Sequence, residues 1–321
     1  MIRRQIVSVT LNPAVDWVLE APNFKVGSHI RARRIGWYPA GNGINVSRVL
    51  ATLGTRSVAT GFIGRGELTL FEEYLERVGL GRVVMQLLIV RGRTRDNMTF
   101  TDPINDTETH VRDEGFKVSP DDVRRIISKV GMLARDDSVV VFGGSTPPGV
   151  TVGDFRSMLH RCQDQGALTV VDTSERILEA LRGEPIWMAK LNASELHTLS
   201  QMPTETEEQV IEAARAVSRT GGGQVKIVVA TRGADGAVLI APGVERVAKV
   251  AVHPGLICNT VGCGDSLLAG LIHAWSVSHD WERALAMGVA TATANAISRT
   301  PGAIDTNDVS EYLGSIIMRT L

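Results

Sequence analysis

Short apolar runs alternate with helical patterns through the second half of the chain. The apolar runs are residues 138–142, 168–172, 186–190 and 225–230, and the helical patterns are residues 151–165, 175–182 and 205–219. Strands that are almost wholly apolar are buried on both faces, as in a parallel sheet that helices cover on each side. The pattern therefore predicts an α/β fold of three layers, α/β/α, around a mostly parallel sheet.

The same fold continues on either side of this region. The expected further strands are residues 5–11, 57–63, 237–240 and 245–252, and the expected further helices are residues 67–78 and 282–298. Another helix is expected to begin after Ser119, because Pro120 and the two acidic residues that follow are typical of a first helical turn. Residues 307–319 close the chain.

Two stretches have a different pattern, in which apolar and polar residues alternate. They are residues 17–38 and a set of three short runs at residues 86–90, 94–101 and 107–111. Alternation with a period of two indicates strands that have one exposed face. We therefore expect a small antiparallel sheet that stands off the main domain as a lid.

Residues 258–266 connect a strand pattern to an apolar helical pattern, so we expect a helix to begin near Gly264. Glycines at positions 262 and 264 leave backbone N–H groups open, and free N–H groups at a helix start bind anions. Asp265 would repel a resting phosphate, which favours a base that takes a proton from a hydroxyl while the amides hold a phosphoryl group. The alternative is a simple capped helix start, and these residues alone leave both interpretations open.

A second small-residue loop precedes the helix that ends near Gly54. It reads Pro-Ala-Gly-Asn-Gly-Ile-Asn-Val over residues 39–46. Its glycines would let a ligand approach bare backbone, and Asn42 and Asn45 would offer hydrogen bonds without charge, which suits a sugar. A plain turn with an N-terminal cap is the alternative interpretation.

Polar residues also follow two of the buried strands. In open α/β sheets, ligands bind at the carboxyl ends of the strands. Residues 143–149 lie at such an end, and so do Lys190, Asn192 and Glu195. Asn192 and Glu195 have the spacing of a capping box. Glu195 also has the chemistry to stand near a bound Mg²⁺ through water, and the two roles are compatible.

Composition excludes several classes of protein. The chain has 321 residues, 21% of them charged, and a net charge of −1, which gives no sign of nucleic-acid binding. No apolar run is long enough to span a bilayer. Cys162, Cys258 and Cys263 lack metal-type spacing and suit a reducing cytoplasm. Cys263 is expected to be a small residue in a tight turn rather than a reactive thiol.

Several motifs in a fixed order resemble one family. They are Asn-Pro-Ala-Val-Asp at 12–16, Ala-Gly-Asn-Gly-Ile-Asn-Val at 40–46, Gly-Arg-Thr-Arg-Asp-Asn at 92–97, Gly-Ser-Thr-Pro-Pro-Gly at 144–149, Lys-x-Asn-x-x-Glu at 190–195 and Thr-Val-Gly-Cys-Gly-Asp-Ser at 260–266. Each motif is weak alone, but the ordered set is similar to the PfkB/ribokinase family of ATP-dependent sugar kinases, in particular its phosphosugar branch. The resemblance covers essentially the whole chain and implies a ribokinase-like fold.

The resemblance implies specific roles at the acceptor and transfer sites. Asp265 would be the base. The amides of the anion hole would come from Gly262, Cys263 and Gly264, although family members usually have Ala at position 263. The positions for sugar hydroxyls are Asp16, Gly41 and Asn45, and those for a phosphate already on the substrate are Arg31 and Arg95. Arginine suits the last task because its planar fork grips phosphate with paired hydrogen bonds.

The resemblance also implies ATP and Mg²⁺ as cofactors. The positions that match the nucleotide site are Lys190, Asn192, Thr231, Gly233 and Gly236, with Asn295 on the adenine side. The motif that orders Mg²⁺ contains Asn192 and Glu195, and Asp172 is a candidate for the water shell of the metal.

The implied domain division separates a lid from a catalytic domain. The lid would be residues 14–39 and 89–114, and the catalytic domain residues 1–13, 40–88 and 115–321. In the family the lid closes over the sugar and often helps to form a homodimer. Position 42 is Asn where many relatives of this branch have Lys, position 29 is His where some have Lys, and position 191 is Leu where Pro is usual.

The implied reaction is transfer of the γ-phosphoryl group of MgATP to a hydroxyl of a ketohexose phosphate. Fructose 1-phosphate is favoured over tagatose 6-phosphate and fructose 6-phosphate. Two alternatives stay open: a kinase for an unphosphorylated sugar or nucleoside, and a non-catalytic sugar- or nucleotide-binding protein. We expect a small-molecule partner and a cytoplasmic enzyme, with neither a nucleic acid nor a membrane as partner.

Overall fold

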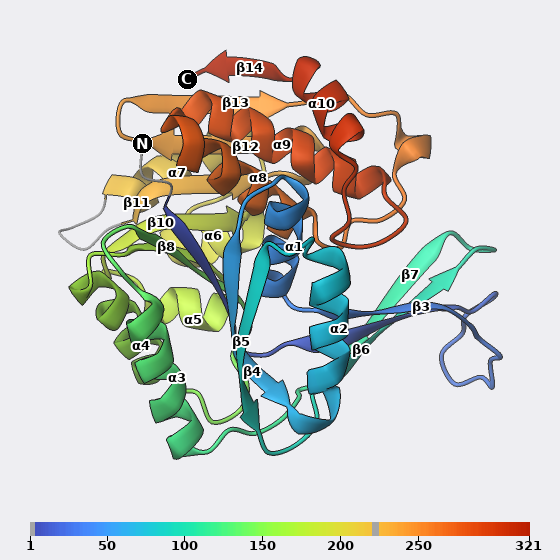
Figure 1. Ribbon diagram of the computed structural model, residues 1–321. Helices are drawn as coiled ribbons and strands as arrows, with labels where there is room; N and C mark the ends of the chain where they lie inside the picture. The colour runs from blue at the N-terminus through green and yellow to red at the C-terminus, as the bar shows by residue number, and fades with distance from the viewer. Residues whose placement is uncertain (1–3, 220–224) are drawn as a thin grey trace.

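The computed structural model describes residues 4–219 and 225–321, which form a large sheet and a small one (Figure 1). The strands of the large sheet are β1 (Gln5–Thr10), β4 (Ser57–Gly64), β5 (Val83–Val90), β8 (Ser138–Gly144), β9 (Leu168–Thr173), β10 (Ile186–Asn192), β11 (Val225–Thr231), β12 (Ala237–Ala241), β13 (Val244–Lys249) and β14 (Ile317–Thr320). Their order is β14-β13-β12-β11-β10-β9-β8-β1-β4-β5. The strands from β5 to β11 in this order are parallel, and β12, β13 and β14 continue antiparallel. The predicted mostly parallel sheet is therefore confirmed.

Helices cover both faces of this sheet. They are α1 (Asn42–Thr52), α2 (Leu68–Val78), α3 (Pro120–Leu133), α4 (Val152–Asp164), α5 (Glu175–Ala180), α6 (Ala193–Ser200), α7 (Glu207–Arg219), α8 (Cys263–Ser278), α9 (Trp281–Ile297) and α10 (Thr306–Gly314). Short 3₁₀ helices are η1 (Arg65–Glu67), η2 (Gly233–Asp235) and η3 (Pro254–Leu256). Val140 and Phe142 of β8 pack in the core that contains α3 to α7, whereas Val139 and Val141 pack in the core of α1, α8 and α9. Alternate residues of one apolar strand thus serve two cores, which gives the predicted three layers.

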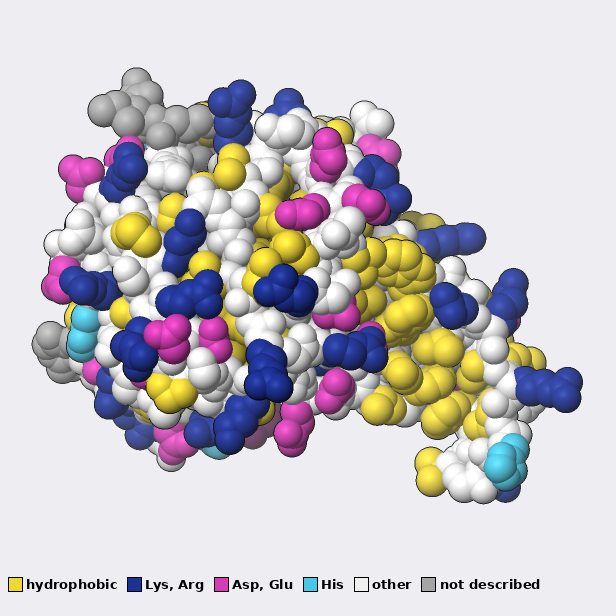
Figure 2. Space-filling view, turned by 60° about the horizontal axis from the view of Figure 1, so that its bottom comes forward, with side chains coloured by type: hydrophobic (Ala, Val, Ile, Leu, Met, Phe, Trp, Pro, Cys, Tyr) yellow, Lys and Arg dark blue, Asp and Glu magenta, His cyan; other side chains and the backbone are white. Residues whose placement is uncertain are grey.

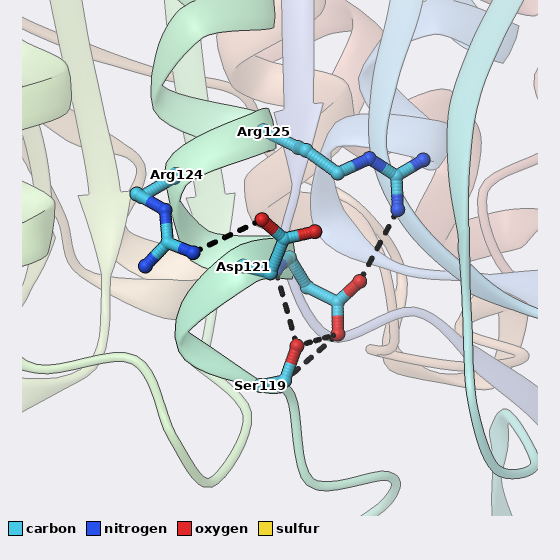
Figure 3. Close-up of polar contacts among 5 residues, drawn as sticks. Ser119, Asp121, Arg124 and Arg125 are labelled. Carbon is cyan, nitrogen blue, oxygen red and sulfur yellow. Dashed lines mark hydrogen bonds and ion pairs between the residues drawn. The ribbon is translucent and has the colours of Figure 1, made fainter.

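The first turn of α3 is fixed by a capping box (Figure 3). The Ser119 hydroxyl accepts a hydrogen bond from the amide of Asp122, and the Asp122 carboxylate accepts one from the amide of Ser119. Arg124 and Arg125 form ion pairs with Asp121 and Asp122 at 3.1 and 3.3 Å. Pro120 occupies the first helical position, where its missing N–H costs nothing. The helix start predicted at Ser119 is confirmed.

The small sheet projects from the main body (Figure 1). Its strands are β2 (Ala14–Glu20), β3 (Arg33–Ala40), β6 (Arg95–Asp102) and β7 (Thr107–Arg112), in the order β3-β2-β6-β7. The chain contributes it in two excursions, β2 with β3 and β6 with β7. The central pair, β2 with β6, is parallel, so the lid is not wholly antiparallel as the alternation predicted.

One prediction about the lid is wrong. Residues 86–90 belong to β5, which pairs in parallel with β4 along its whole length and forms an edge of the large sheet. In this segment Leu87 and Ile89 pack on the core that contains α2, and Leu88 packs on the opposite core, so both faces of this edge strand are partly buried. An edge strand of a large sheet and a lid strand have the same sequence period.

The outer end of the lid is tied together by Asp102, which is buried. Its carboxylate accepts hydrogen bonds from the backbone amides of Asn23, Phe24 and Ile104 and from the side chain of Asn105. The Asn105 hydrogen bond, together with those from the backbone, holds the pKa of Asp102 well below its usual range despite its burial. This carboxylate therefore joins the loop after β2 to the turn between β6 and β7.

The remaining elements lie close to their predicted places. The helix expected near Gly264 begins at Cys263, and the closing segment forms α10 and β14. Within the described part of the chain, no helix combines the length and apolar character that crossing a bilayer requires.

Candidate active site

Polar loops gather at the carboxyl ends of the parallel strands. They follow β1, β8, β9, β10 and β11, and the helices α1 and α8 begin in the same region. Loops at this edge are the usual binding site of open α/β sheets, because the strands deliver several chain segments to one place.

Asp265 lies in the first turn of α8, and only 5% of it is exposed. Nδ2 of Asn45, in the first turn of α1, donates a hydrogen bond to Oδ2 of Asp265 at 2.7 Å. Asn42, in the same turn, also hydrogen-bonds this carboxylate. The two glycine-rich loops that the sequence suggested separately therefore form one site.

Small residues at positions 262 and 264 are required by close neighbours. Gly262 has a φ of 79°, in the left-handed region, and a Cβ there would lie 2.9 Å from the amide nitrogen of Gly302. A Cβ at Gly264 would lie 2.8 Å from Nζ of Lys190. The amide of Ser266 bonds to the carbonyl of Gly262 at 2.9 Å, and the amide of Cys263 bonds to the carbonyl of Thr260 at 3.4 Å. Of the predicted anion hole, the amide of Gly264, together with that of Asp265, therefore lies at the helix start without a backbone partner among the described residues.

The loop before α8 is held by Asn295 of α9, which is fully buried. Its Nδ2 donates to the carbonyl of Val261 at 2.9 Å and to Sγ of Cys263 at 3.1 Å, and its Oδ1 accepts from the amide of Gly302 at 2.7 Å. The contact of Asn295 with adenine remains a prediction, and in this structure its side chain shapes the loop that precedes α8. Burial raises the pKa of the Cys263 thiol, which argues against a reactive thiolate.

A buried ion pair lies beside Asp265. Nζ of Lys190 is 2.7 Å from Oδ1 of Asp172, and both side chains are less than 10% exposed. Burial disfavours the charged form of Lys190, but the charge of Asp172 and its hydrogen bond outweigh burial, so the pKa of Lys190 is raised. Lys190 therefore stays charged, and it faces Gly264 at the start of α8.

Burial raises the pKa of Asp265 to about 7, and the negative charge of Asp172 adds to this effect. The hydrogen bond from Asn45, the charge of Lys190 and the hydrogen bond from Asn42 act in the opposite direction. A carboxyl group that titrates near neutral pH has the basicity that a general base needs.

The predicted nucleotide residues follow β10 and β11. Oδ1 of Asn192 accepts from the amide of Glu195 at 2.9 Å, and Oε2 of Glu195 accepts from the amide of Asn192 at 2.8 Å. The predicted capping box is thus confirmed. Thr231 lies opposite Asn192 in the strand register, and Gly233 and Gly236 shape the turn that follows with φ of 59° and 82°. Their contact with a nucleotide remains a prediction.

The carboxylates near the site can supply only some of the ligands of a Mg²⁺ ion, so waters and phosphates would have to supply the rest. In residues 4–219 and 225–321 no three side chains of His, Cys, Asp or Glu form a metal cluster. Oδ2 of Asp172, however, is buried and has no hydrogen-bond partner in the protein. Mg²⁺ commonly binds one or two carboxylates, several waters and substrate phosphates, so Asp172 and Glu195 fit that pattern.

The predicted acceptor residues lie on the lid and at its junction with α1. Nδ2 of Asn97 donates to Oδ1 of Asp16 at 2.8 Å. Burial raises the pKa of Asp16, although Asn97 and the charge of Arg95 oppose the shift. Gly41 has a φ of 138°, and a Cβ there would lie 2.6 Å from Cγ2 of Thr10. Glycine is thus the residue that both the backbone and the space at position 41 allow.

The two arginines predicted to hold a substrate phosphate are placed differently. Arg95 is half-buried, and its Nη2 donates to the carbonyl of Asn12 at 3.1 Å. Arg31 is exposed in the loop between β2 and β3, and no hydrogen bond or ion pair joins it to another described residue. The structure therefore brings Arg95 to the site and leaves Arg31 at the outer part of the lid.

Several buried polar atoms near the site lack partners. They are Thr10 Oγ1, Asn12 Oδ1, Arg95 Nε, Asn97 Oδ1 and Asp172 Oδ2. Buried polar atoms in proteins are nearly always hydrogen-bonded, so a group of orphaned donors and acceptors marks a place for a polar ligand. Thr10, Asn12 and Asn97 were not among the predicted site residues. The signals that could have found them are the end of the first strand for Thr10, and the motifs at 12–16 and 92–97 for Asn12 and Asn97.

Comparison with known proteins identifies the family to which this chain belongs. The pfkB family carbohydrate kinase profile matches residues 5–307. The chain belongs to the pfkB family of carbohydrate kinases, as the sequence motifs predicted. It is therefore a phosphotransferase whose acceptor is a sugar hydroxyl.

Curated relatives and a solved structure agree with this family. The chain is 32% identical to 1-phosphofructokinase of Escherichia coli K12 over 292 residues, which are 90% of each chain. It is 30% identical to 1-phosphofructokinase of Bacillus subtilis over 298 residues, which are 92% of this chain and 94% of that one. A structure of phosphofructokinase-2 from Escherichia coli in complex with substrates and products matches with a TM-score of 0.88, at 23% identity, over 97% of this chain and 98% of that one. The last comparison supports the ribokinase-like fold.

Proposed function

We propose that this protein is an ATP-dependent phosphosugar kinase that transfers the γ-phosphoryl group of MgATP to a hydroxyl of a ketohexose phosphate. Fructose 1-phosphate, which would give fructose 1,6-bisphosphate, is the first candidate because the relatives from Escherichia coli and Bacillus subtilis are named 1-phosphofructokinase. The observation that carries the proposal is the buried Asp265 carboxylate beside the free amides of the α8 start.

In the proposed reaction Asp265 accepts the proton of the acceptor hydroxyl. Asn45 orients the carboxylate through its 2.7 Å hydrogen bond, and the raised pKa of Asp265 makes it a better base than an exposed aspartate. The amides at Gly264 and Asp265 stabilise negative charge on the phosphoryl oxygens during in-line transfer. Most of the rate enhancement in such a reaction comes from placement and electrostatics.

The opposite end of the site would hold the nucleotide. Lys190 supplies a fixed positive charge next to the α8 start, and its ion pair with Asp172 keeps it in place. When Mg²⁺ is bound it would neutralise charge on the phosphates. Asp172 and Glu195 would hold its waters. The turn of Gly233 and Gly236 would let the nucleotide approach the backbone.

The lid would close over the acceptor and exclude water that would otherwise hydrolyse ATP. Asp16 would bind a sugar hydroxyl, with Asn97 holding its carboxylate. Arg95 would bind the phosphate that the acceptor already carries, because a guanidinium pairs with phosphate through parallel hydrogen bonds.

The proposed homodimer rests on the other face of the lid. Figure 2 shows hydrophobic side chains gathered on the projecting part of the molecule. Trp17 lies opposite Trp37 and Met98, and Met98 lies opposite Val111, so these residues share one face of the small sheet. Trp37, Met98 and Val111 are 40%, 39% and 51% exposed. A contiguous apolar face of this kind marks an interaction surface, and a second copy of the chain is the proposed occupant.

Cys162, Cys258 and Cys263 are all free thiols. Together with the family, this supports a reducing, cytoplasmic location as part of the proposal.

A coupled assay of ADP release tests the proposal. Fructose 1-phosphate, fructose 6-phosphate, tagatose 6-phosphate, fructose, ribose and adenosine are compared with MgATP, with the Asp265→Asn variant as control. Turnover restricted to a phosphosugar and lost in the control is expected. Turnover only on an unphosphorylated acceptor would overturn the phosphosugar assignment, and binding of ligands without any turnover would favour the non-catalytic alternative.

A further inference from the structure

A hollow of about 480 Å³ opens beside the loop that follows β8. Its volume lies within the range of roughly 300–1,000 Å³ that is usual for small-molecule sites. The loop of residues 145–151 forms one wall, and Asn12, Arg95, Glu114 and Arg176 complete it. Of these residues, Arg95 and the loop of residues 145–149 were predicted to lie at a ligand site, whereas Asn12, Glu114 and Arg176 were not.

The hollow begins next to a residue that borders the proposed transfer site. A Cβ at Gly144 would lie 3.0 Å from Oδ1 of Asn42, and Asn42 hydrogen-bonds Asp265. Ser145, the next residue along the chain, already lines the hollow and accepts a 3.4 Å hydrogen bond from Nδ2 of Asn12. This adjacency would allow an acceptor whose reacting hydroxyl lies at Asp265 to extend its other end past Gly144 towards the hollow.

The wall of the hollow is held rigidly. The amide of Val118 donates to the carbonyl of Pro148 at 2.9 Å, and the Thr173 hydroxyl donates to the carbonyl of Gly144 at 2.7 Å. Gly149 has a φ of 101°, and a Cβ there would lie 2.3 Å from the carbonyl oxygen of Val118. A hollow whose walls are fixed before the ligand arrives binds with little loss of conformational entropy.

Two orphaned polar atoms belong to residues that line the hollow. Nε of Arg95 is a buried donor without a partner, while its Nη1 and Nη2 are engaged by the carbonyls of Asp113 and Asn12 at 3.5 and 3.1 Å. Oδ1 of Asn12 is a buried acceptor without a partner. The donor suits a phosphate oxygen and the acceptor suits a sugar hydroxyl. A phosphorylated sugar satisfies both.

Arg176 supplies a second guanidinium to the same hollow. It stands in the first turn of α5, directly after β9, and its side chain is exposed. Among the side chains that the structure describes, no carboxylate is paired with Arg176 by a hydrogen bond or an ion pair. Glu114 is the one carboxylate among the residues that line the hollow, and its exposed side chain is screened by solvent. Two arginines against one exposed carboxylate leave the hollow with a net positive charge.

We propose that Arg176 is a specificity-determining residue that binds, together with Arg95, the phosphate already present on the acceptor. The inference rests on the proposed phosphosugar kinase function and deepens it. It places the second arginine of the phosphate clamp on α5, near the carboxyl end of β9, rather than at the exposed Arg31 of the lid. Phosphate with its two negative charges favours such a pair of guanidinium groups.

The test compares Arg176→Ala with Arg176→Lys and with Arg124→Ala as the matched control, since Arg124 is an exposed arginine on α3 whose ion pair with Asp121 lies on the surface. In Arg176→Ala the KM for fructose 1-phosphate should rise about 10- to 100-fold, while the KM for MgATP and kcat stay within about twofold. Arg176→Lys should recover part of the loss, because it keeps the charge without the fork. An unchanged KM, or an equal rise in the KM for MgATP, overturns the proposal.

A second measurement separates this inference from the proposed function. Binding of inorganic phosphate to wild type, Arg176→Ala and Arg124→Ala is followed by ³¹P NMR line broadening in the presence of MgADP, which needs no turnover. Weaker phosphate binding in Arg176→Ala alone supports the clamp even if no phosphosugar is a substrate. Equal phosphate binding in all three proteins overturns the clamp even if fructose 1-phosphate is a substrate.

Discussion

The two ends of the proposed site differ in how far the protein itself satisfies their buried polar groups. At the transfer end, Asp265, Lys190 and Asn295 are buried, and hydrogen bonds or ion pairs within the protein hold each of them. At the acceptor end, the residues stand on a projecting sheet and around an open hollow, and Asn12 and Arg95 keep buried polar atoms without partners. The proposed transfer end is therefore preorganised, whereas we expect the proposed acceptor end to be completed by its ligand.

The largest expected effect is at the transfer end. Asp265→Asn should lower kcat by roughly 10²–10⁴, the range for loss of a positioned general base, because the amide cannot accept the hydroxyl proton. Steady-state kinetics with saturating MgATP measure the change. Asp164→Asn, at an exposed carboxylate on α4, is the matched control. Near-normal turnover in Asp265→Asn would show that another group is the base.

Lys190→Met should come next, and its effect is on stability. Removing one partner of a buried ion pair leaves Asp172 uncompensated, which costs about 3–5 kcal/mol. Urea unfolding of the wild type and the variant gives the difference in free energy. The double variant Lys190→Met with Asp172→Asn should recover most of the loss. If the double variant is as unstable as the single one, the ion pair is not the cause.

Arg95→Ala should alter the acceptor end alone. Loss of a guanidinium that binds phosphate should raise the KM for the phosphosugar about 10- to 100-fold, as expected for hydrogen bonds to a charged group. The KM for MgATP should stay nearly constant, because Arg95 lies at the other end of the site. Initial-rate measurements with each substrate varied in turn decide the matter, and equal effects on both substrates would contradict the division into two ends.

The pH dependence should follow the raised pKa of Asp265. A base must be ionised to accept a proton, so kcat/KM should rise about tenfold per pH unit below about 7 and then level off. Folding raises the pKa of Asp265 from 3.8 to about 7. The contribution of this carboxyl group to the free energy of unfolding is therefore fully present below pH 3.8 and is lost as the pH rises through 7. Asp265→Asn should therefore gain melting temperature relative to wild type at pH 8 but not at pH 4. A flat difference between the two pH values would contradict the raised pKa.

The smallest expected effect is on assembly. Trp37→Glu places a charge on the apolar lid face and should shift the protein from dimer to monomer, with little change in the transfer chemistry. Light scattering after size-exclusion chromatography measures the molar mass. Val26→Glu is the control, because Val26 is 91% exposed in the loop after β2 and outside that face. A monomeric wild type would refute the lid dimer directly.

Local sequence signals predicted a large part of the fold and the starts of its functional helices. The capping boxes at Ser119 and Asn192 and the start of α8 depend on residues within a few positions of one another. Their geometry is set by backbone hydrogen bonds that local sequence determines. The apolar strands were also predictable, because burial on both faces leaves little room for polar residues.

Contacts between distant segments could not be predicted in the same way. The hydrogen bond between Asn45 and Asp265 joins positions 220 residues apart, and nothing in either loop specifies the other. The ion pair of Lys190 with Asp172 depends on the register of neighbouring parallel strands. Strand β5 was placed in the lid because its alternation is equally compatible with an edge of the large sheet.

The hydrogen bonds of Asp102 also bear on how the lid would open. It joins two insertions that leave the main body at separate points in the chain, since its hydrogen bonds reach the loop after β2 as well as the turn after β6. Because β2 and β6 pair along their whole length and this carboxylate closes their outer end, neither insertion can unfold while the other stays ordered. The lid is therefore one cooperative unit, and its amide protons should exchange with solvent together, in a single opening event rather than hairpin by hairpin.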